Sequence, residues 1–357
     1  MTKLNTIPPM TAEAMAYLGH DEVEVAVEVA PTKMSKKRKG VFAAMGILLL
    51  LLGLLFAWYL TNRKPLSELP GLSSTQLPHY EMSIYGSTRP LGVAVTPTGD
   101  RIYVTESSGT RLVKMYDRAG KQTAVLKPPA STGVNHTPIY VAINPITLDV
   151  YVSDRIAASI YIYDANGKYL RTFAPKGDLN GKFNPLALAF APDGTLYASD
   201  IRGTDAKSHR IVAFAPDGTV QRSMGAPGQL TYPNGIAVDR QGNIQVSDSG
   251  NGRMVVFTQY GKMLATISRG IGEGDLGMPK GAAVDDSGRL FVADTTDHQV
   301  RLYLVGDSKA TPTYIGSFGD EGQTDGTFEY PTGVATDKRA HIYVADRDNN
   351  RVQVWGY

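Results

Sequence analysis

The chain has 357 residues, no cysteine, and a formal net charge of +2 from 36 basic and 34 acidic side chains. The absence of thiols excludes disulfides, thiolate catalysis and cysteine-ligated zinc, and the balanced charge argues against a nucleic-acid partner. Gly (37) and Pro (21) are plentiful while charged residues make up only 20%. This composition is typical of many short strands joined by turns.

The first 40 residues are predicted to form a disordered cytoplasmic tail. Residues 22–29 alternate between acidic and apolar side chains with the period of a strand. Nothing obvious nearby offers a partner strand or a core, and a segment that cannot bury apolar surface stays disordered.

Residues 41–60 form an uncharged apolar run of 20 residues. At about 1.5 Å per residue, a helix of this length spans roughly 30 Å, the hydrocarbon thickness of a bilayer. A cleaved signal peptide has a shorter apolar region that ends in a small-x-small site, whereas this run ends in Trp58, Tyr59 and Leu60. We therefore interpret it as an uncleaved transmembrane helix.

The charges on either side of this run predict its orientation. Five basic residues lie between Lys33 and Lys39, and only Arg63 and Lys64 follow the run. The positive-inside rule then places the N-terminus in the cytoplasm and the remainder of the chain outside. Residues 61–78 contain Pro, Gly and Ser and are predicted to be a linker, and an exported domain without cysteine favours a prokaryotic source.

Residues 79–357 contain a sixfold internal repeat. Each copy begins with a proline and reaches an acidic residue fifteen or sixteen positions later, as in Pro233 to Asp248. The acids are Glu106, Asp154, Asp200, Asp248, Asp294 and Asp346, and successive acids are 48, 46, 48, 46 and 52 residues apart. Periods of this length indicate propeller blades or a solenoid.

Each copy divides into short strands. In the fourth copy, residues 235–238, 244–247, 254–257 and 263–267 are rich in apolar and β-branched side chains, and Asp-Arg-Gln-Gly-Asn between the first two is a turn. Four antiparallel strands make one blade. The last copy reaches only a third strand, and residues 79–86 resemble a fourth. We expect this N-terminal strand to complete the last blade and remove an exposed edge.

The repeated pattern, P-x-G-V-A-V-D followed by G-x-I-Y-V-A-D and N-x-R-I-x-V-F, resembles the NHL repeat in all six copies. The resemblance implies an all-β six-bladed NHL-type β-propeller over residues 79–357, preceded here by the predicted transmembrane helix. It implies less about function, because the fold hosts unrelated activities. NHL-type relatives include scaffolds, receptor-like ectodomains and a few lyases or lactonases.

The repeat predicts one functional face. The first strand begins and the second strand ends on the same side of the disc, and loops on one face of a rigid scaffold are the usual binding surface. Arginine and tyrosine there suit an anionic ligand or a protein hot spot, although such cations can also simply pair with neighbouring acids. The candidate ligand-binding residues are Arg89, Arg155, Arg202, Tyr232, Asn234, Lys280, Tyr330, Thr332 and Arg347.

The six repeated acids are predicted to be structural. A residue required once in every blade is suited to accept backbone N–H groups or to pair with Arg210, Arg253 or Arg351. We therefore do not interpret these acids as paired catalytic carboxylates.

Histidine tests the enzyme hypothesis. The resembling peptidyl-hydroxyglycine lyases hold zinc with histidines directly after the blade-opening proline, and no residue in that position is histidine here. His209 and His298 are expected in outer loops. Lactonase-like relatives use carboxylates and amides at the channel, and here Asn184 and Asn234 lack a matching carboxylate. No catalytic residue, metal site or cofactor is predicted.

The sequence therefore favours a membrane-anchored, extracytoplasmic propeller that binds a protein or other macromolecular ligand through its loop face, as a scaffold, adaptor or sensor. The predicted partners are this ligand and, through residues 41–60, the membrane, with no nucleic acid. Two alternatives stay open: a metal-dependent lyase or hydrolase of an exported peptide or small molecule, and a structural subunit of an envelope complex.

Overall fold

The computed structural model describes residues 45–54, 56, 77–129, 135–179, 183–202, 206–306 and 309–357. The predicted tail (1–40) and residues 61–76 of the predicted linker lie outside these ranges. The chain divides into two compact units, Met1–Leu72 and Ser73–Tyr357.

In the first unit, residues 45–54 and 56 are helical and fall within the run predicted to cross a membrane. The large apolar side chains of this helix are between 49% and 65% exposed. Within the described ranges, no helix has both the length and the apolarity needed to span a bilayer. Residues 41–44, 55 and 57–60 lie outside those ranges, and the transmembrane helix stays a prediction.

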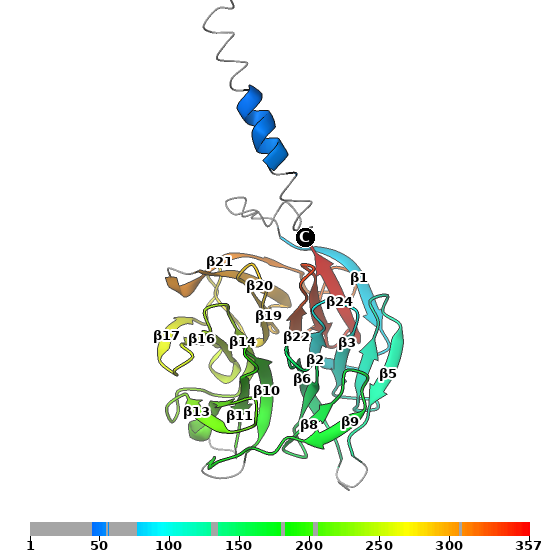
Figure 1. Cartoon of the computed structure of the whole chain (residues 1–357), viewed down its shortest axis with the longest axis vertical. Helices are drawn as coiled ribbons and strands as arrows, with labels where there is room; N and C mark the ends of the chain where they lie inside the picture. Colours follow the sequence, from blue (N-terminus) through cyan, green and yellow to red (C-terminus); the bar gives the residue numbers. More distant parts are fainter. Residues whose placement is uncertain are drawn as a thin grey trace, which may run out of the picture. The chain divides into compact units, whose positions relative to one another are not determined.

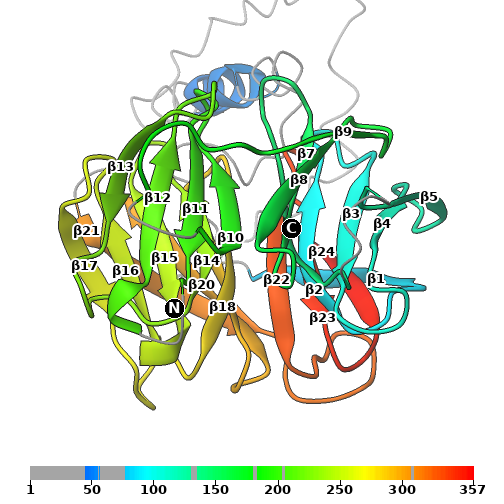
Figure 2. The same cartoon turned by 90° about the horizontal axis from the view of Figure 1, so that it is seen from below.

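The second unit is a ring of six four-stranded antiparallel sheets, which confirms the predicted all-β, six-bladed fold (Figures 1 and 2). Blades 1 to 3 comprise β2 (Pro90–Val95), β3 (Ile102–Glu106), β4 (Val113–Tyr116) and β5 (Gln122–Leu126); β6 (Pro138–Ile143), β7 (Val150–Asp154), β8 (Ser159–Tyr163) and β9 (Tyr169–Thr172); β10 (Pro185–Phe190), β11 (Leu196–Asp200), β12 (Arg210–Phe214) and β13 (Val220–Met224). Blades 4 to 6 comprise β14 (Pro233–Val238), β15 (Ile244–Asp248), β16 (Arg253–Phe257) and β17 (Met263–Ile267); β18 (Pro279–Val284), β19 (Arg289–Asp294), β20 (Gln299–Gly306) and β21 (Lys309–Phe318); β22 (Pro331–Thr336), β23 (Ile342–Asp346), β24 (Arg351–Gly356) and β1 (His79–Tyr85). Two 3₁₀ turns, η4 (Ala206–Ser208) and η5 (Ser249–Asn251), follow β11 and β15.

The sixth blade combines strands from both ends of the propeller. Strand β1 pairs antiparallel with β24, with His79 opposite Gly356 and Tyr85 opposite Arg351. The expectation that the N-terminal strand completes the last blade is confirmed. This pairing covers the edge that β24 would otherwise expose.

The first strand of each blade lies next to the axis, and β5, β9, β13, β17 and β21 lie at the periphery (Figure 1). The third residue of this inner strand is glycine in four blades because neighbouring inner strands approach closely. A Cβ atom on Gly235 would lie 2.0 Å from the carbonyl oxygen of Lys280, and one on Gly281 would lie 2.4 Å from that of Thr332. No side chain fits in such gaps.

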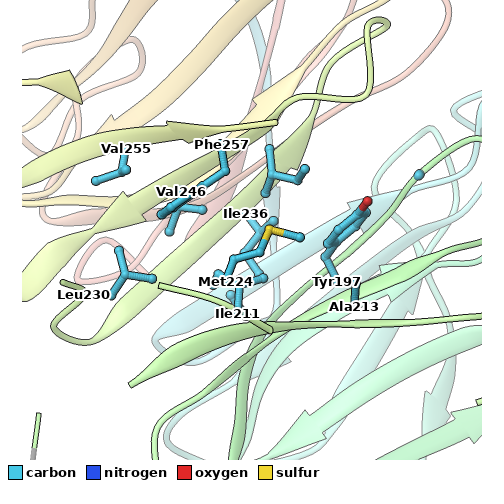
Figure 3. Close-up of a cluster of buried hydrophobic side chains, with 12 residues drawn as sticks. Tyr197, Ile211, Ala213, Met224, Leu230, Ile236, Val246, Val255 and Phe257 are labelled. Atoms are coloured by element: carbon cyan, nitrogen blue, oxygen red, sulfur yellow. The ribbon is translucent and has the colours of Figure 1, made fainter. Parts of the chain in front are cut away.

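Apolar side chains fill the space between facing blades. Between blades 3 and 4, Tyr197 and Met224 meet Ile236, Val246 and Phe257, all buried (Figure 3). Since each sheet is covered on both faces by its neighbours, its second strand is buried at every position, as in β15, except at Arg289 at the start of β19. This explains why these strands are apolar on both faces rather than alternating.

A histidine connects β1 to the turn before β23. His341 Nδ1 lies 2.9 Å from Asp337 Oδ2, and its Nε2 lies 3.7 Å from Glu81 Oε2 on β1. The hydrogen bond to Asp337 raises the pKa of His341, and the negative charges of Asp337 and Glu81 raise it further. Burial and the charge of Arg339 act in the opposite direction but do not cancel this shift. Burial opposes ionisation of Asp337, but the hydrogen bonds from His341 still lower its pKa.

We predict that this contact makes the propeller less stable as the pH rises above about 6.5. The folded-state pKa of His341 is raised above the unfolded value of about 6.5, so its stabilisation is complete below that pH and is lost as the pH rises through the folded pKa. Melting temperatures of the full chain between pH 6 and 9 should fall, and His341→Gln should flatten that fall. His79→Gln, an exposed histidine on the same strand as Glu81, is the control. An equally steep pH dependence in His341→Gln would contradict the assignment.

Candidate functional site

The inner strands begin and the second strands end on the same face of the disc, which we call the proline face. In blade 4, Pro233 of β14 pairs with Asp248 of β15 at this face. The turns that follow the inner strands form the opposite face, which we call the turn face. This geometry follows from the antiparallel pairing of the two strands.

All six repeat acids are buried at the proline face. Each accepts a hydrogen bond from a backbone N–H group just before the proline of its own blade; the donors are Thr88, Thr137, Asn184, Thr231, Gly277 with Met278, and Glu329. Each also faces a basic side chain; these are Lys114, His136, Arg202 with Arg210, Arg253, Arg301 and Arg351.

Blade 6 shows how fully such an acid is used. Asp346 accepts hydrogen bonds from the Glu329 backbone N–H at 2.7 Å, from Arg351 Nε at 2.8 Å, and from the side-chain amides of Asn349 and Gln353, both at 2.9 Å. Its partner Arg351 is only 3% exposed. A carboxylate with this many partners holds the turn in place and has no oxygen left for a substrate.

Two histidines support the residue that precedes the proline. The Nδ1 atoms of His209 and His298 accept the backbone N–H groups of Tyr232 at 3.0 Å and Tyr330 at 3.3 Å. Both tyrosines have left-handed backbones, with φ of 46° and 53°, a conformation that bulky side chains adopt only when the surroundings impose it. The two histidines therefore position tyrosines. In the described part of the chain, no group of three or more acidic or histidine side chains is placed to hold a metal ion.

The residue after the proline divides the proline face into two unlike halves. In blades 1 to 3 it is apolar, and Leu91, Ile139 and Leu186 pack together with Ile201 and Tyr140. Tyr140 stands where four other blades carry the close-approach glycine, and burial raises the pKa of its phenol. In blades 4 to 6 the equivalent residues are polar: Asn234, Lys280 and Thr332.

The residue before the proline also differs between blades, and in blade 1 it is the exposed Arg89. In blades 4 to 6 it is a large side chain that stays exposed: Tyr232 (42%), Met278 (39%) and Tyr330 (38%). We call these three residues the blade 4–6 arc. The sequence singled out both tyrosines, but not Met278, because a methionine in a loop carries no signal of its own.

Three cations gather where blades 5, 6 and 1 meet. Arg89 lies 2.9 Å from Asp348 Oδ1, and Arg347 donates two hydrogen bonds of 2.9 Å to the same carboxylate. The guanidinium of Arg347 also lies 5.2 Å from the ring centroid of Tyr330. Burial lowers the pKa of Lys280, the charge of Arg347 lowers it further, and Asp348 opposes both effects. We call Arg89, Lys280 and Arg347, together with the carboxylate of Asp348, the cation cluster.

The remaining candidates lie apart from this cluster. Arg202 donates to Asp200 Oδ2 and to the Leu179 carbonyl oxygen, both at 2.6 Å. The Thr332 hydroxyl is buried and donates to the carbonyl oxygen of Leu91, which joins blade 6 to blade 1. These contacts show that Arg202 and Thr332 each have a structural partner within the propeller. Arg155 is exposed on blade 2, away from blades 4 to 6.

An axial channel lies between the inner strands. It holds a cavity of about 220 Å³, and none of the side chains that line it is charged. A second cavity of about 340 Å³ at the turn face shares Ile143, Phe190, Val238 and Val284 with the first. Its charged lining residues include Asp239 and Asp285, which already accept hydrogen bonds from their own turns. The other charged residues of this lining are Arg240, Asp286 and Lys338.

The comparisons with known proteins support the same fold. Residues 230–257, 276–303 and 328–355 match the model of the NHL repeat, and these segments lie in blades 4, 5 and 6. A 53-residue segment is 49% identical to the E3 ubiquitin-protein ligase TRIM71 of Gallus gallus and 47% identical to that of Bos taurus. The segment is 13% of this chain and spans only 6% of the length of those relatives.

Solved structures of similar fold are more distant in sequence. A streptogramin B lyase matches with a TM-score of 0.56 and 11% identity, over 78% of this chain and 97% of its own. The PQQ-bound aldose sugar dehydrogenase from Streptomyces coelicolor matches with a TM-score of 0.55 and 16% identity, over 78% of this chain and 98% of its own. A chain of a nidogen/laminin complex matches with a TM-score of 0.52 and 18% identity, over 65% of this chain and 80% of its own. At these identities the likeness shows the fold alone. The protein is thus a six-bladed β-propeller that contains NHL repeats.

We predict that Asp346→Ala destabilises the propeller by about 3 kcal/mol, because it leaves the buried guanidinium of Arg351 without its main partner. Chemical denaturation of the full chain measures the change. Asp217→Asn is the matched control, since Asp217 and its partner Lys176 are both well exposed and such pairs add little. Equal stability of the two variants would rule out the structural role of the repeat acid.

Proposed function

We propose that the chain is a non-catalytic binding protein whose propeller captures a protein ligand through the blade 4–6 arc, as a scaffold, adaptor or sensor. The observation that carries this proposal is the arc itself, in which Tyr232, Met278 and Tyr330 stay exposed and Tyr330 lies against Arg347 of the cation cluster. Tyrosine, methionine and arginine are the side chains enriched in protein interfaces.

The arc is also held rigid, which favours affinity. His209 and His298 fix the backbone of Tyr232 and Tyr330, and their rings pack on the tyrosine rings with centroids 4.7 Å and 4.5 Å apart. Side chains that are already ordered lose less conformational entropy on binding. A large ligand can therefore use these residues as preformed contact points.

The enzyme alternatives find less support. The repeat acids are saturated by backbone and basic partners, and the described lining of the channel offers no paired acid and base. The similarity to TRIM71 covers one short segment, so the ligase named there supports a shared repeat rather than a shared reaction.

We predict that Tyr232→Asn together with Tyr330→Asn abolishes ligand capture without unfolding the propeller. Asparagine tolerates the left-handed backbone at both positions, so the change removes the rings and keeps the turns. Full-length tagged chain is crosslinked in its native cells, and captured proteins are quantified by mass spectrometry. Tyr260→Asn, an equally bulky ring that is 77% exposed at the turn face, is the control. A partner retained at full yield by the double variant would place the site elsewhere.

We further propose that residues 41–60 anchor the chain in a membrane, with the N-terminus in the cytoplasm and the propeller outside. Support comes from the uncharged run of 20 residues and from the basic residues that precede it. The exposed leucines at residues 48–52 form a continuous apolar surface, and such surfaces mark contact with a membrane or a partner.

The absence of native cysteine allows a direct test of this topology. We predict that Lys262→Cys, in the turn before β17, reacts with a membrane-impermeant maleimide on intact cells, whereas Thr2→Cys reacts only after lysis. Each variant is labelled before and after permeabilisation and compared with the unmodified chain. Labelling of Thr2→Cys on intact cells, or protection of Lys262→Cys, would reverse or refute the proposed orientation.

A further inference from the structure

We propose that the cation cluster is a carboxylate-binding subsite, and that the protein ligand places an acidic side chain between Lys280 and Arg347. This inference rests on the proposed function and adds the chemistry of the ligand. The cluster consists of Arg89, Lys280 and Arg347 around the single carboxylate of Asp348. Its net charge is therefore about +2 before any ligand arrives.

Lys280 is the first reason for this assignment. Its side chain is half-buried, and the inner strand on which it lies approaches the inner strand of blade 6, where a Cβ atom on the next residue, Gly281, would lie 2.4 Å from the carbonyl oxygen of Thr332. The charge of Arg347, which follows the second strand of blade 6, lowers the pKa of Lys280, and in the described part of the chain no carboxylate lies within ion-pair distance of its ammonium group. Burying a cation next to another cation is unfavourable unless an anion compensates it. The structural basic residues show the contrast, since Arg253 and Arg351 each lie 2.8 Å from a buried acid of their own blade.

Asp348 is the second reason, because it organises the cluster without neutralising it. Both carboxylate oxygens accept hydrogen bonds from Arg347, and Oδ1 also forms an ion pair with Arg89. The two guanidiniums are thereby held together at the proline face, while Lys280 has no ion-pair partner among the described residues. Asp348 belongs to no repeat position, since the structural acid of blade 6 is Asp346. Its carboxylate competes with any incoming anion for the same guanidinium donors.

The surroundings favour an acidic protein segment over a nucleic acid. A single-stranded nucleic acid stacks its bases on open aromatic faces and needs basic groups along an extended track. Here the Tyr330 ring already contacts His298 and Arg347, and the Tyr232 ring contacts His209. The residues that flank the proline of blade 4, Tyr232 and Asn234, are uncharged, so the positive charge of the cluster does not continue into that blade, and the cluster suits one or two carboxylates.

The test is the binding of fluorescein-labelled hexaglutamate to the full-length chain, followed by fluorescence anisotropy at low salt. Lys280→Gln should weaken binding by about tenfold, the loss of one charge-assisted contact. Asp348→Asn should strengthen binding because it removes the internal competitor. Opposite effects from two neighbouring residues are not expected of a structural defect, and melting temperatures measured in parallel verify that both variants are folded.

Matched variants separate the subsite from general electrostatics. Arg171→Gln removes an exposed cation from β9 of blade 2, and Glu273→Gln removes an exposed acid from the loop before blade 5; both should leave hexaglutamate binding unchanged. If they alter binding as strongly as Lys280→Gln and Asp348→Asn do, the attraction is diffuse and the subsite is refuted.

Two further outcomes would overturn the inference and leave the proposed function separately testable. Hexauridylate RNA that binds as tightly as hexaglutamate, with the same response to Lys280→Gln, would make the partner a nucleic acid. Hexaglutamate affinity that is unchanged in both Lys280→Gln and Asp348→Asn would refute the carboxylate subsite. In that second case, loss of protein capture in the Tyr232→Asn and Tyr330→Asn variant would still support a protein ligand.

Discussion

A buried carboxylate at the end of the second strand of every blade is the contact on which the rest of the propeller depends. It accepts a hydrogen bond from a backbone N–H group at the start of the inner strand and faces a basic side chain, as Asp248 does with Thr231 and Arg253. Because ionised acceptors form stronger hydrogen bonds than neutral ones, one residue per blade fixes the turn, the inner strand and the end of the second strand.

This arrangement leaves the neighbouring side chains free to differ between blades. The acid accepts the backbone N–H group before the proline, so this turn does not depend on the side chains that flank the proline. In blades 1 to 3 the residue after the proline packs in an apolar cluster with Tyr140, whereas in blades 4 to 6 that residue is polar and the residue before the proline is a large exposed side chain. Blades 4 to 6 therefore present a surface that the other three blades lack. A ring of similar blades needs such a difference to bind a ligand in one place.

Residues that break the repeat are more informative about function than residues that keep it. The recurring acids resemble a catalytic set, yet each is consumed by its own turn. Lys280 and Asp348 occur once, and with Arg89 and Arg347 they form a cluster of three cations around one carboxylate at the proline face. Other side chains at this face make structural contacts instead. Arg202 follows a repeat acid and pairs with it, and the hydroxyl of Thr332 donates a hydrogen bond from blade 6 to blade 1.

The sequence by itself determined the number of blades, the four strands of each blade and the strand that closes the ring, because these follow from local patterns that recur about every 48 residues and from the alternation of apolar and turn residues. It also identified the face on which Tyr232, Lys280 and Tyr330 lie. Only the tertiary structure decided which of those candidates are accessible. Arg202 and Thr332 have the right position along the chain, but their polar atoms are taken by Asp200 and by the backbone of the next blade. The role of Asp348 was equally invisible, since it depends on Arg89, which is far away in sequence and adjacent only because the ring closes.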